Sequence, residues 1–189
     1  MSPQPPARAR LLELLKQLSW QRGRVVLSSG KTSDFYIDCK QTALNAEGSA
    51  LVGELVFEHA QALRQQGVRI DGVGGITLGA DPIAAAAAVV SFQRGAPMHA
   101  FIIRKEPKGH GTGQWVEGGK SLPDGAPVLV VEDVVTTGGS TLKALERARQ
   151  SALTPVAILS LVDRNEGGRE AIAATGVPYA SLFTRADFV

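Results

Sequence analysis

Two adjacent carboxylates, Glu132 and Asp133, follow a run of apolar residues from Val128 to Val131. Such a run, with no alternation between apolar and polar positions, is typical of a parallel strand that is buried on both faces. Open sheets of parallel strands bind their ligands beyond the carboxyl ends of the strands. We therefore expect both carboxylates to face a ligand there, where they would accept hydrogen bonds from neutral hydroxyl groups.

A turn of hydroxyl-bearing residues and glycines, Thr136 to Ser140, follows the two carboxylates. A helix is predicted to begin near Ser140, and backbone N–H groups at the start of a helix favour a bound phosphate. Glycine in such a turn lets the backbone approach a ligand closely. The two carboxylates would bind hydroxyl groups, and the turn beside them would bind a phosphate. A ribose 5-phosphate carries both kinds of group. An ordinary surface turn between a strand and a helix is the alternative interpretation.

Two other phosphate-binding patterns are absent from the sequence. The segment lacks the Gly-x-x-x-x-Gly-Lys order of a nucleoside-triphosphate loop. The Gly-x-Gly-x-x-Gly fingerprint of a dinucleotide site is not formed by Gly72, Gly74, Gly75 and Gly79.

Strands and helices are predicted to alternate along most of the chain, which indicates an α/β fold with a mostly parallel sheet. The predicted strands are Gly72–Ile76, His99–Arg104, Val128–Val131 and Val156–Leu161. The predicted helices are about Asp81–Gln93, Ser140–Gln150 and Arg169–Ala174. In the N-terminal part we expect a helix through Leu11 and Leu18 that ends by Gly23, a pair of strands at Val25–Leu27 and Phe35–Cys39, and a helix from the cap Asn45 to about Gln66.

The composition fits one folded domain. The chain has 189 residues, of which 44% are hydrophobic, and its net charge of +2 is too small to indicate nucleic-acid binding. The single cysteine, Cys39, excludes an internal disulfide and is expected to be a packed side chain. The spacing of His and Cys indicates no structural metal site. Since neither a signal peptide nor an apolar run of membrane length is visible, we expect a cytoplasmic protein with no membrane partner.

About twenty residues, from Lys105 to Asp124, are rich in glycine and charge and show little apolar periodicity. A loop of this length in a compact domain is usually functional. Potential cations at its start are Arg104, Lys105, Lys108 and His110. The loop precedes the strand that carries the two carboxylates, so it should lie near them, where it would close over a polyanion. A solvated loop without a binding role is the alternative interpretation.

The segment from Val128 to Thr141 resembles the phosphoribosyl-pyrophosphate (PRPP) signature of the type I phosphoribosyltransferases. The resemblance implies an α/β fold in which helices flank a mostly parallel central sheet, with a small N-terminal hood. It also implies that the acidic pair holds the ribose hydroxyls and that the following turn holds the 5-phosphate. The implied PRPP-binding residues are Arg104, Lys105, Lys108, His110, Glu132, Asp133, Val134, Val135, Thr136, Thr137, Gly138, Gly139 and Ser140.

The cationic loop narrows this resemblance, because Arg104-Lys105-Glu106 with Lys108 and His110 resembles the catalytic loop of the orotate phosphoribosyltransferases. In that family the loop reaches the PRPP of the neighbouring subunit. The resemblance therefore implies a homodimer whose mobile catalytic loop, about residues 105–124, serves the partner's site. The implied catalytic residues are Lys105, Lys108, His110 and Asp133.

A second motif, from Leu27 to Asp38, resembles the hood segment that covers the orotate base in this family. It implies a hood of about residues 1–45 within a single domain of residues 1–189. Near the other end of the chain, Arg164 stands where the family has an arginine that recognises orotate, and a guanidinium fits a carboxylate bidentately. The implied orotate-binding residues are Tyr36, Ile37, Thr136 and Arg164.

The implied reaction converts orotate and PRPP into orotidine 5′-monophosphate and pyrophosphate, a step of pyrimidine synthesis. The implied cofactor is Mg²⁺, bound mainly by substrate oxygens rather than by a set of protein ligands. The chain departs from some members of the family at Ser28 and Leu78, where those members carry lysines that contact phosphate.

Two other functions share part of this pattern. A purine phosphoribosyltransferase would have the PRPP segment but would require neither the hood motif nor Arg164. A PRPP-sensing regulator would keep the fold and bind nucleic acid, but the chain has no nucleic-acid-binding module and only a modest charge.

Overall fold

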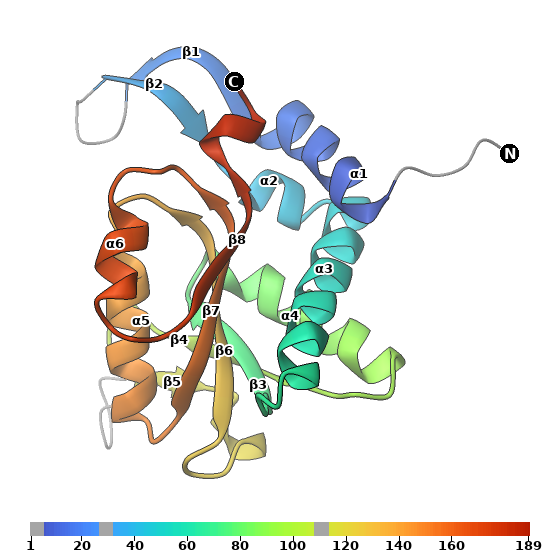
Figure 1. Cartoon of the computed structure of the whole chain (residues 1–189), viewed down its shortest axis with the longest axis vertical. Coiled ribbons are helices and arrows are strands. Elements are labelled where there is room, and N and C mark those ends of the chain that lie inside the picture. The colour runs from blue at the N-terminus through green and yellow to red at the C-terminus, as the bar shows by residue number, and fades with distance from the viewer. Residues whose placement is uncertain (1–5, 27–31, 108–113) are drawn as a thin grey trace, which may run out of the picture.

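A computed structural model describes residues 6–26, 32–107 and 114–189. A central sheet carries helices on both faces, and a hood lies over one end of this sheet (Figure 1). Ser28, Lys108 and His110 lie outside the described residues, so the roles that the sequence gives them stay predictions.

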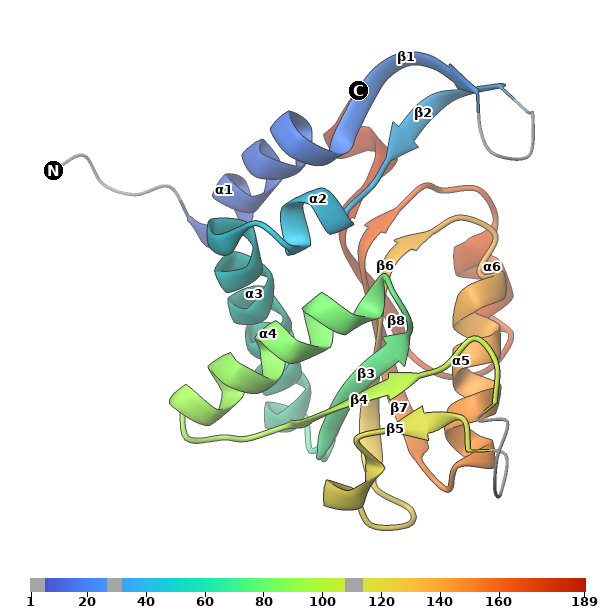
Figure 2. The ribbon, with the colours of Figure 1, turned by 180° about the vertical axis from the view of Figure 1, so that it is seen from behind.

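Within the described residues, six strands form the central sheet in the order β5-β4-β3-β6-β7-β8. All neighbours are parallel except β5, which runs antiparallel to β4 at one edge (Figure 2). The predicted α/β fold with a mostly parallel sheet is therefore confirmed. The strands are β3 (Gly72–Ile76), β4 (His99–Ile103), β5 (Val116–Glu117), β6 (Pro127–Val135), β7 (Thr154–Asp163) and β8 (Tyr179–Thr184).

Strand β6 lies inside the sheet and packs against a core on each face. Leu129 and Val131 belong to the core beneath α3 and α4, whereas Val128 and Val130 belong to the core beneath α5 and α6. Each position of the strand therefore needs an apolar side chain, which explains the unbroken apolar run in the sequence. The helices are α3 (Ala46–Gln65), α4 (Ala80–Gln93), α5 (Gly139–Gln150) and α6 (Gly168–Ala173).

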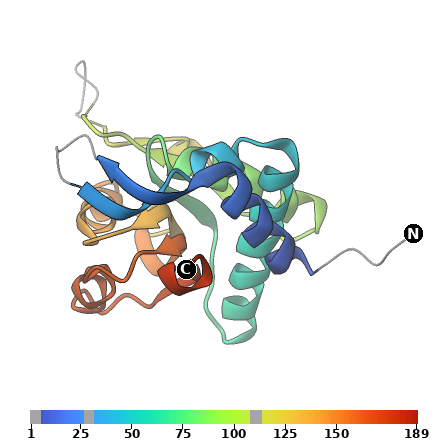
Figure 3. The same ribbon diagram turned by 90° about the horizontal axis from the view of Figure 1, so that it is seen from above.

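The hood is built from both ends of the described chain. Its strands β1 (Trp20–Val26) and β2 (Thr32–Ile37) form an antiparallel pair, and the C-terminal end lies beside them (Figure 3). The ring of Phe188 lies 6.1 Å from the ring of Trp20 and 5.7 Å from that of Phe35, measured between centroids. The sequence did not predict that C-terminal residues pack in the hood. It also did not predict β8, the strand that precedes them.

The first helix passes through Leu11 and Leu18 and ends before Gly23, as predicted. Helix α1 (Ala7–Leu14) continues into a π-helical turn (Leu15–Ser19), and β1 begins at Trp20. The buried hydroxyl of Ser19 lies 2.7 Å from the Thr42 hydroxyl of α2 (Lys40–Ala43). This contact fixes the chain where it turns into the hood.

Three predicted boundaries differ from the structure. Strand β6 continues past Val131 because it pairs with β7 as far as the pair Val135 and Asp163. The segment predicted to be an irregular loop contains β5 and a 3₁₀ turn, and it buries Leu122 in a core. Strand β2 ends at Ile37, so Cys39 lies outside the strand, although its side chain is fully buried as expected.

Close packing between β3, β6 and α4 depends on Gly75. A Cβ atom at this position would lie 2.1 Å from the Val131 carbonyl oxygen and 2.7 Å from the Ala80 Cβ. We predict that Gly75→Ala lowers the free energy of unfolding by about 3 kcal/mol, because backbone must move to admit the methyl group. Urea unfolding measures this change. The control Gly119→Ala, whose Cβ would meet its nearest atom at 3.6 Å, should leave stability nearly unchanged; equal stability of both variants would contradict the packing argument.

Candidate active site

The two side chains of the acidic pair leave β6 on opposite faces of the sheet, while their carboxyl groups stay close enough to interact. Successive side chains of a strand alternate in direction, so Glu132 extends toward α5 and Asp133 toward the start of α4. Accordingly, the Thr141 hydroxyl of α5 donates to Glu132 Oε2 at 3.4 Å, while a Cβ on Gly79 would lie 2.5 Å from Asp133 Cγ. Both residues lie within β6 rather than after it, close to the carboxyl end of the strand.

Burial changes the protonation of Glu132. Glu132 is only 6% exposed to solvent. Loss of hydration, with a smaller contribution from the charge of Asp133, raises the pKa of Glu132 from 4.5 to about 8. Near neutral pH this carboxyl group therefore carries a proton in the free protein, and it can both donate and accept a hydrogen bond.

Asp133 is more accessible than Glu132, and two neighbouring groups interact with its carboxylate. The Val134 backbone N–H donates to its Oδ1 at 2.9 Å, and Lys40 Nζ of α2 lies 3.9 Å from its Oδ2. Lys40 also pairs with Asp38 at 2.5 Å. The Asp38 carboxylate is the main cause that raises the pKa of Lys40, so the ammonium group stays charged beside the acidic pair.

The turn that the sequence indicated as a phosphate site encloses a cavity of about 270 Å³. Gly138 stands just before α5 with φ of +82°, and no side chain caps this helix start. The first N–H groups of an α-helix have no partner within the helix, so they are available to an anion in this cavity. The cavity is lined by Val134, Val135, Thr136, Thr137, Gly138, Gly139, Ser140, Thr141 and Lys143.

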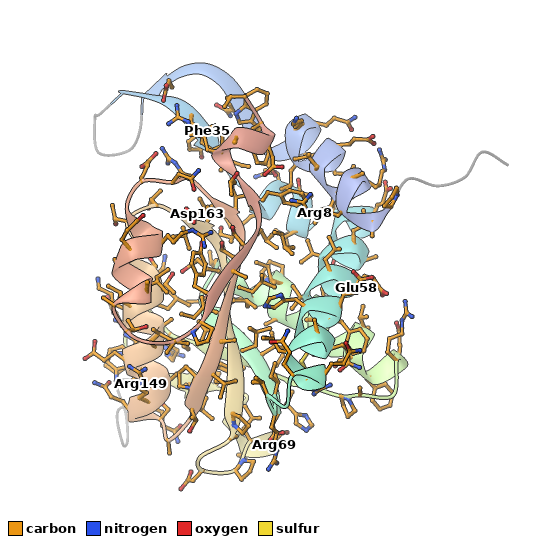
Figure 4. All side chains as sticks on the ribbon, viewed as in Figure 1. Arg8, Phe35, Glu58, Arg69, Arg149 and Asp163 are labelled. Carbon is orange, nitrogen blue, oxygen red and sulfur yellow. The ribbon has the colours of Figure 1, made fainter. Side chains whose placement is uncertain are left out.

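Arg164 lies beside this turn because it follows β7, the neighbour of β6. Its backbone N–H donates to the Val135 carbonyl at 2.9 Å. Its guanidinium carbon lies 5.7 Å from the ring centroid of Phe35 in the hood, and its side chain is 12% exposed. Figure 4 labels Phe35 in the hood and Asp163, the last residue of β7, at the end of the sheet that faces it. Arg164 therefore occupies the space between the sheet and the hood.

Of the other three residues predicted for the base, Thr136 lines the cavity at the start of α5, and Tyr36 and Ile37 lie on β2 of the hood. Tyr36 pairs with Gln21 and Ile37 with Trp20 across the hairpin. The Ile37 side chain is buried in a core, so its backbone is the part that remains for a ligand. Contact of either residue with a base stays a prediction.

Arg104 and Lys105 line a different cavity, of about 440 Å³, together with Thr77 and Asp81. Arg104 Nη1 forms an ion pair with Glu117 Oε1 at 3.0 Å, and its backbone carbonyl accepts a hydrogen bond from Arg147 at 3.0 Å. Lys105 is exposed. The structure thus brings together the acidic pair, Arg164 and the turn of Thr136 to Ser140, called the phosphate turn below. The described start of the cationic loop lines a different cavity from this turn.

Two features are absent from the residues that the structure describes. They contain no group of three or more His, Cys, Asp or Glu side chains that could hold a metal ion. None of the described helices is both long enough and apolar enough to cross a membrane.

Comparison with known proteins decides the family. Residues 56–176 match the model of the phosphoribosyl transferase domain. An orotate phosphoribosyltransferase of Sorangium cellulosum is 50% identical over 182 residues, which cover 96% of this chain and 93% of that protein. The chain belongs to the orotate phosphoribosyltransferase family.

Solved structures of this family have the same fold. The orotate phosphoribosyltransferase of Mycobacterium tuberculosis in complex with Fe(III) dicitrate superimposes with a TM-score of 0.81 at 40% identity, over 97% of this chain and 99% of that chain. The same enzyme in complex with PRPP gives a TM-score of 0.77 at 37% identity, with the same coverage. The type I phosphoribosyltransferase fold that the motifs implied is therefore confirmed.

Several site residues of this family member were not found by sequence reasoning. Lys143 lines the phosphate turn, and its position one helical turn after Gly139 was a usable signal, because i and i+4 share a helix face. Lys40 and Glu166 gave no such signal. Their contacts with Asp133 and Arg164 depend on how the hood and the turn after β7 fold.

The raised pKa of Glu132 makes a prediction about stability. The folded state retains a proton that the unfolded chain releases between pH 4.5 and about 8, so this residue lowers stability progressively as the pH rises through that range. We predict that Glu132→Gln removes this cost. The unfolding free energy of Glu132→Gln minus that of the wild type should therefore increase with pH. Between pH 5 and pH 8 we expect an increase on the order of 1 kcal/mol per pH unit.

Urea unfolding of the ligand-free protein at several pH values measures the slope. Glu170→Gln is the matched control, since Glu170 is exposed in the first turn of α6. A parallel pH dependence of wild type and Glu132→Gln would show that Glu132 ionises normally.

Proposed function

We propose that this chain transfers the 5-phosphoribosyl group from PRPP to orotate in the cytoplasm, giving orotidine 5′-monophosphate and pyrophosphate. One observation carries the proposal. The acidic pair, the phosphate turn and Arg164 converge at the carboxyl end of β6 and β7 beneath the hood. A ribose 5-phosphate and a base that bears a carboxylate need these groups side by side.

Each part of this site has a chemical role in the proposal. The N–H groups and hydroxyls of Thr136 to Ser140 bind the 5-phosphate. Glu132 and Asp133 bind the ribose hydroxyls, and the Arg164 guanidinium binds the carboxylate of orotate. The backbone near Tyr36 and Ile37 covers the pyrimidine and excludes water from the reacting atoms.

Charge separates as the bond between ribose C1 and pyrophosphate breaks. The ribose ring becomes more positive and the leaving pyrophosphate more negative, so Asp133 would stabilise the ring while Lys105, Lys108 and His110 stabilise the leaving group. Lys108 or His110 would also donate a hydrogen bond or a proton to the pyrophosphate. These groups act more strongly on the transition state than on the bound substrates.

We further propose that Mg²⁺ takes part, held mainly by oxygens of PRPP. A carboxylate oxygen is a suitable additional ligand for this hard cation, and the partly exposed Asp133 supplies one at the acidic pair. When bound, Mg²⁺ would neutralise charge on the pyrophosphate group.

The proposal includes a homodimer in which the loop that starts at Lys105 acts on the partner's PRPP. Two features support it. Lys105 lines a cavity that shares no lining residue with the phosphate turn of its own chain. Helix α4 also exposes large apolar side chains, with Phe92 77% and Val89 57% exposed, and association with a second copy would remove such surface from water.

The absorbance of orotate, followed with the protein and Mg²⁺ before and after the addition of PRPP, tests the proposed reaction. We expect loss of orotate that depends on PRPP, and no consumption of adenine or hypoxanthine. Consumption of a purine instead would favour a purine phosphoribosyltransferase. If no base reacts, specific binding to nucleic acid is the next measurement, since it would favour the regulator.

Arg164→Ala should raise the KM for orotate about ten- to a hundredfold, because a charged hydrogen bond to the substrate is lost. The KM for PRPP should change little. Steady-state kinetics with each substrate varied in turn measures both constants. Arg149→Ala, at an exposed position in the last turn of α5 (Figure 4), is the control; a similar effect on both substrates would contradict the assignment of Arg164.

Mixing two impaired variants, assayed at an orotate concentration well below the KM of Arg164→Ala, tests the exchange of loops. Lys105→Ala impairs the loop and Arg164→Ala impairs the base site, so a mixed dimer keeps one intact composite site. Random reassociation of equal amounts would restore about one quarter of the wild-type activity. Activity is measured after the subunits have exchanged. No recovery in mixtures whose subunit exchange is verified would contradict loop donation to the partner.

A further inference from the structure

The guanidinium group of Arg164 forms an ion pair with a carboxylate of its own chain. Arg164 Nη2 lies 2.7 Å from Glu166 Oε1. The Arg164 side chain is 12% exposed, whereas that of Glu166 is 36% exposed. The Arg164 guanidinium is thus mostly buried, whereas solvent and ligands can reach the Glu166 carboxylate that pairs with it.

The turn after β7 sets this ion pair in place. Asp163, which is fully buried, accepts a hydrogen bond from the Asn165 backbone N–H at 2.9 Å. It also lies 3.2 Å from Arg169 Nη2 of α6. Asn165 has a φ of +55° and Gly167 a φ of +90°, two left-handed residues that reverse the chain on either side of Glu166. The backbone therefore returns Glu166 toward Arg164.

We propose that Glu166 determines affinity for the base: its carboxylate pairs with Arg164 as a substitute for the carboxylate of orotate, and orotate displaces it when it binds. This inference rests on the proposed function, which assigns Arg164 to the base. A guanidinium pairs well with a carboxylate from either source because the geometry of the two pairs is the same.

Displacement follows from electrostatics. If Glu166 stayed on Arg164 while orotate bound, two carboxylates would share one guanidinium in a largely buried site, and their like charges would repel. When orotate binds, Glu166 must move toward solvent, and its exposure makes that movement possible. A base without a carboxylate would leave the internal pair intact.

A purely structural role for Glu166 leads to the opposite expectation. If Glu166 orients Arg164 for the substrate, its removal should weaken orotate binding. If it competes with the substrate, its removal should strengthen binding. The direction of the change therefore separates the two roles.

Glu166→Gln tests the inference, since it removes the charge and keeps the size of the side chain. We expect the KM and the Kd for orotate to fall about two- to fivefold, the range set by a partly exposed ion pair. The KM for PRPP and the Kd for uracil, which lacks the carboxylate, should stay unchanged. Glu170→Gln, which removes a neighbouring exposed carboxylate in α6, should leave all four constants unchanged.

Calorimetric titration with orotate and with uracil, combined with steady-state kinetics, gives these constants. A higher or unchanged KM and Kd for orotate in Glu166→Gln would overturn the inference while leaving the proposed function intact. Equal tightening of uracil would also overturn it. Glu166→Ala should change orotate binding in the same direction, which serves as the test if the glutamine variant does not fold. A wild type that neither binds nor converts orotate would instead refute the proposed function, and the inference would fall with it.

Discussion

Strand alternation at Glu132 and Asp133 is the constraint on which the rest of the site depends. Two consecutive residues of β6 leave the strand on opposite faces of the sheet, one toward α5 and one toward the start of α4, while their carboxyl groups stay close enough to interact. Both helices must then begin close to the acidic pair, and Gly79 permits the close approach on the α4 side. Because β6 lies between β3 and β7, the turns that follow all three strands meet at this point.

The hood closes the same end of the sheet through contacts between distant parts of the chain. Phe35 meets Phe188 from the C-terminal end and faces the guanidinium groups of Arg164 and Arg185. Lys40, which follows β2, reaches Asp133 from the hood side. A substitution in the hood should therefore also alter the surroundings of the acidic pair and of Arg164, since single residues of the hood contact them.

Much of this arrangement could be predicted from the sequence, because strong local patterns encode it. The alternation of strands and helices indicated the fold class, which the structure confirms. The unbroken apolar run of β6 and the glycine-rich turn after it indicated a ribose 5-phosphate site, which stays a prediction. Strand β8 was missed because its residues Tyr179 to Leu182 are only partly buried and show no apolar run. The roles of Lys40 and Glu166 were missed because they depend on tertiary contacts, and the length of β6 because its last pairs depend on β7.

A crystal structure of the protein with PRPP and Mg²⁺ is the most direct test of the central claim, which is that the carboxyl end of β6 binds a ribose 5-phosphate. We expect the 5-phosphate to contact the backbone N–H groups of residues 137–141 and the ribose hydroxyls to contact Glu132 and Asp133. Binding of the ribose 5-phosphate group elsewhere, with the acidic pair in contact only with water, would contradict it.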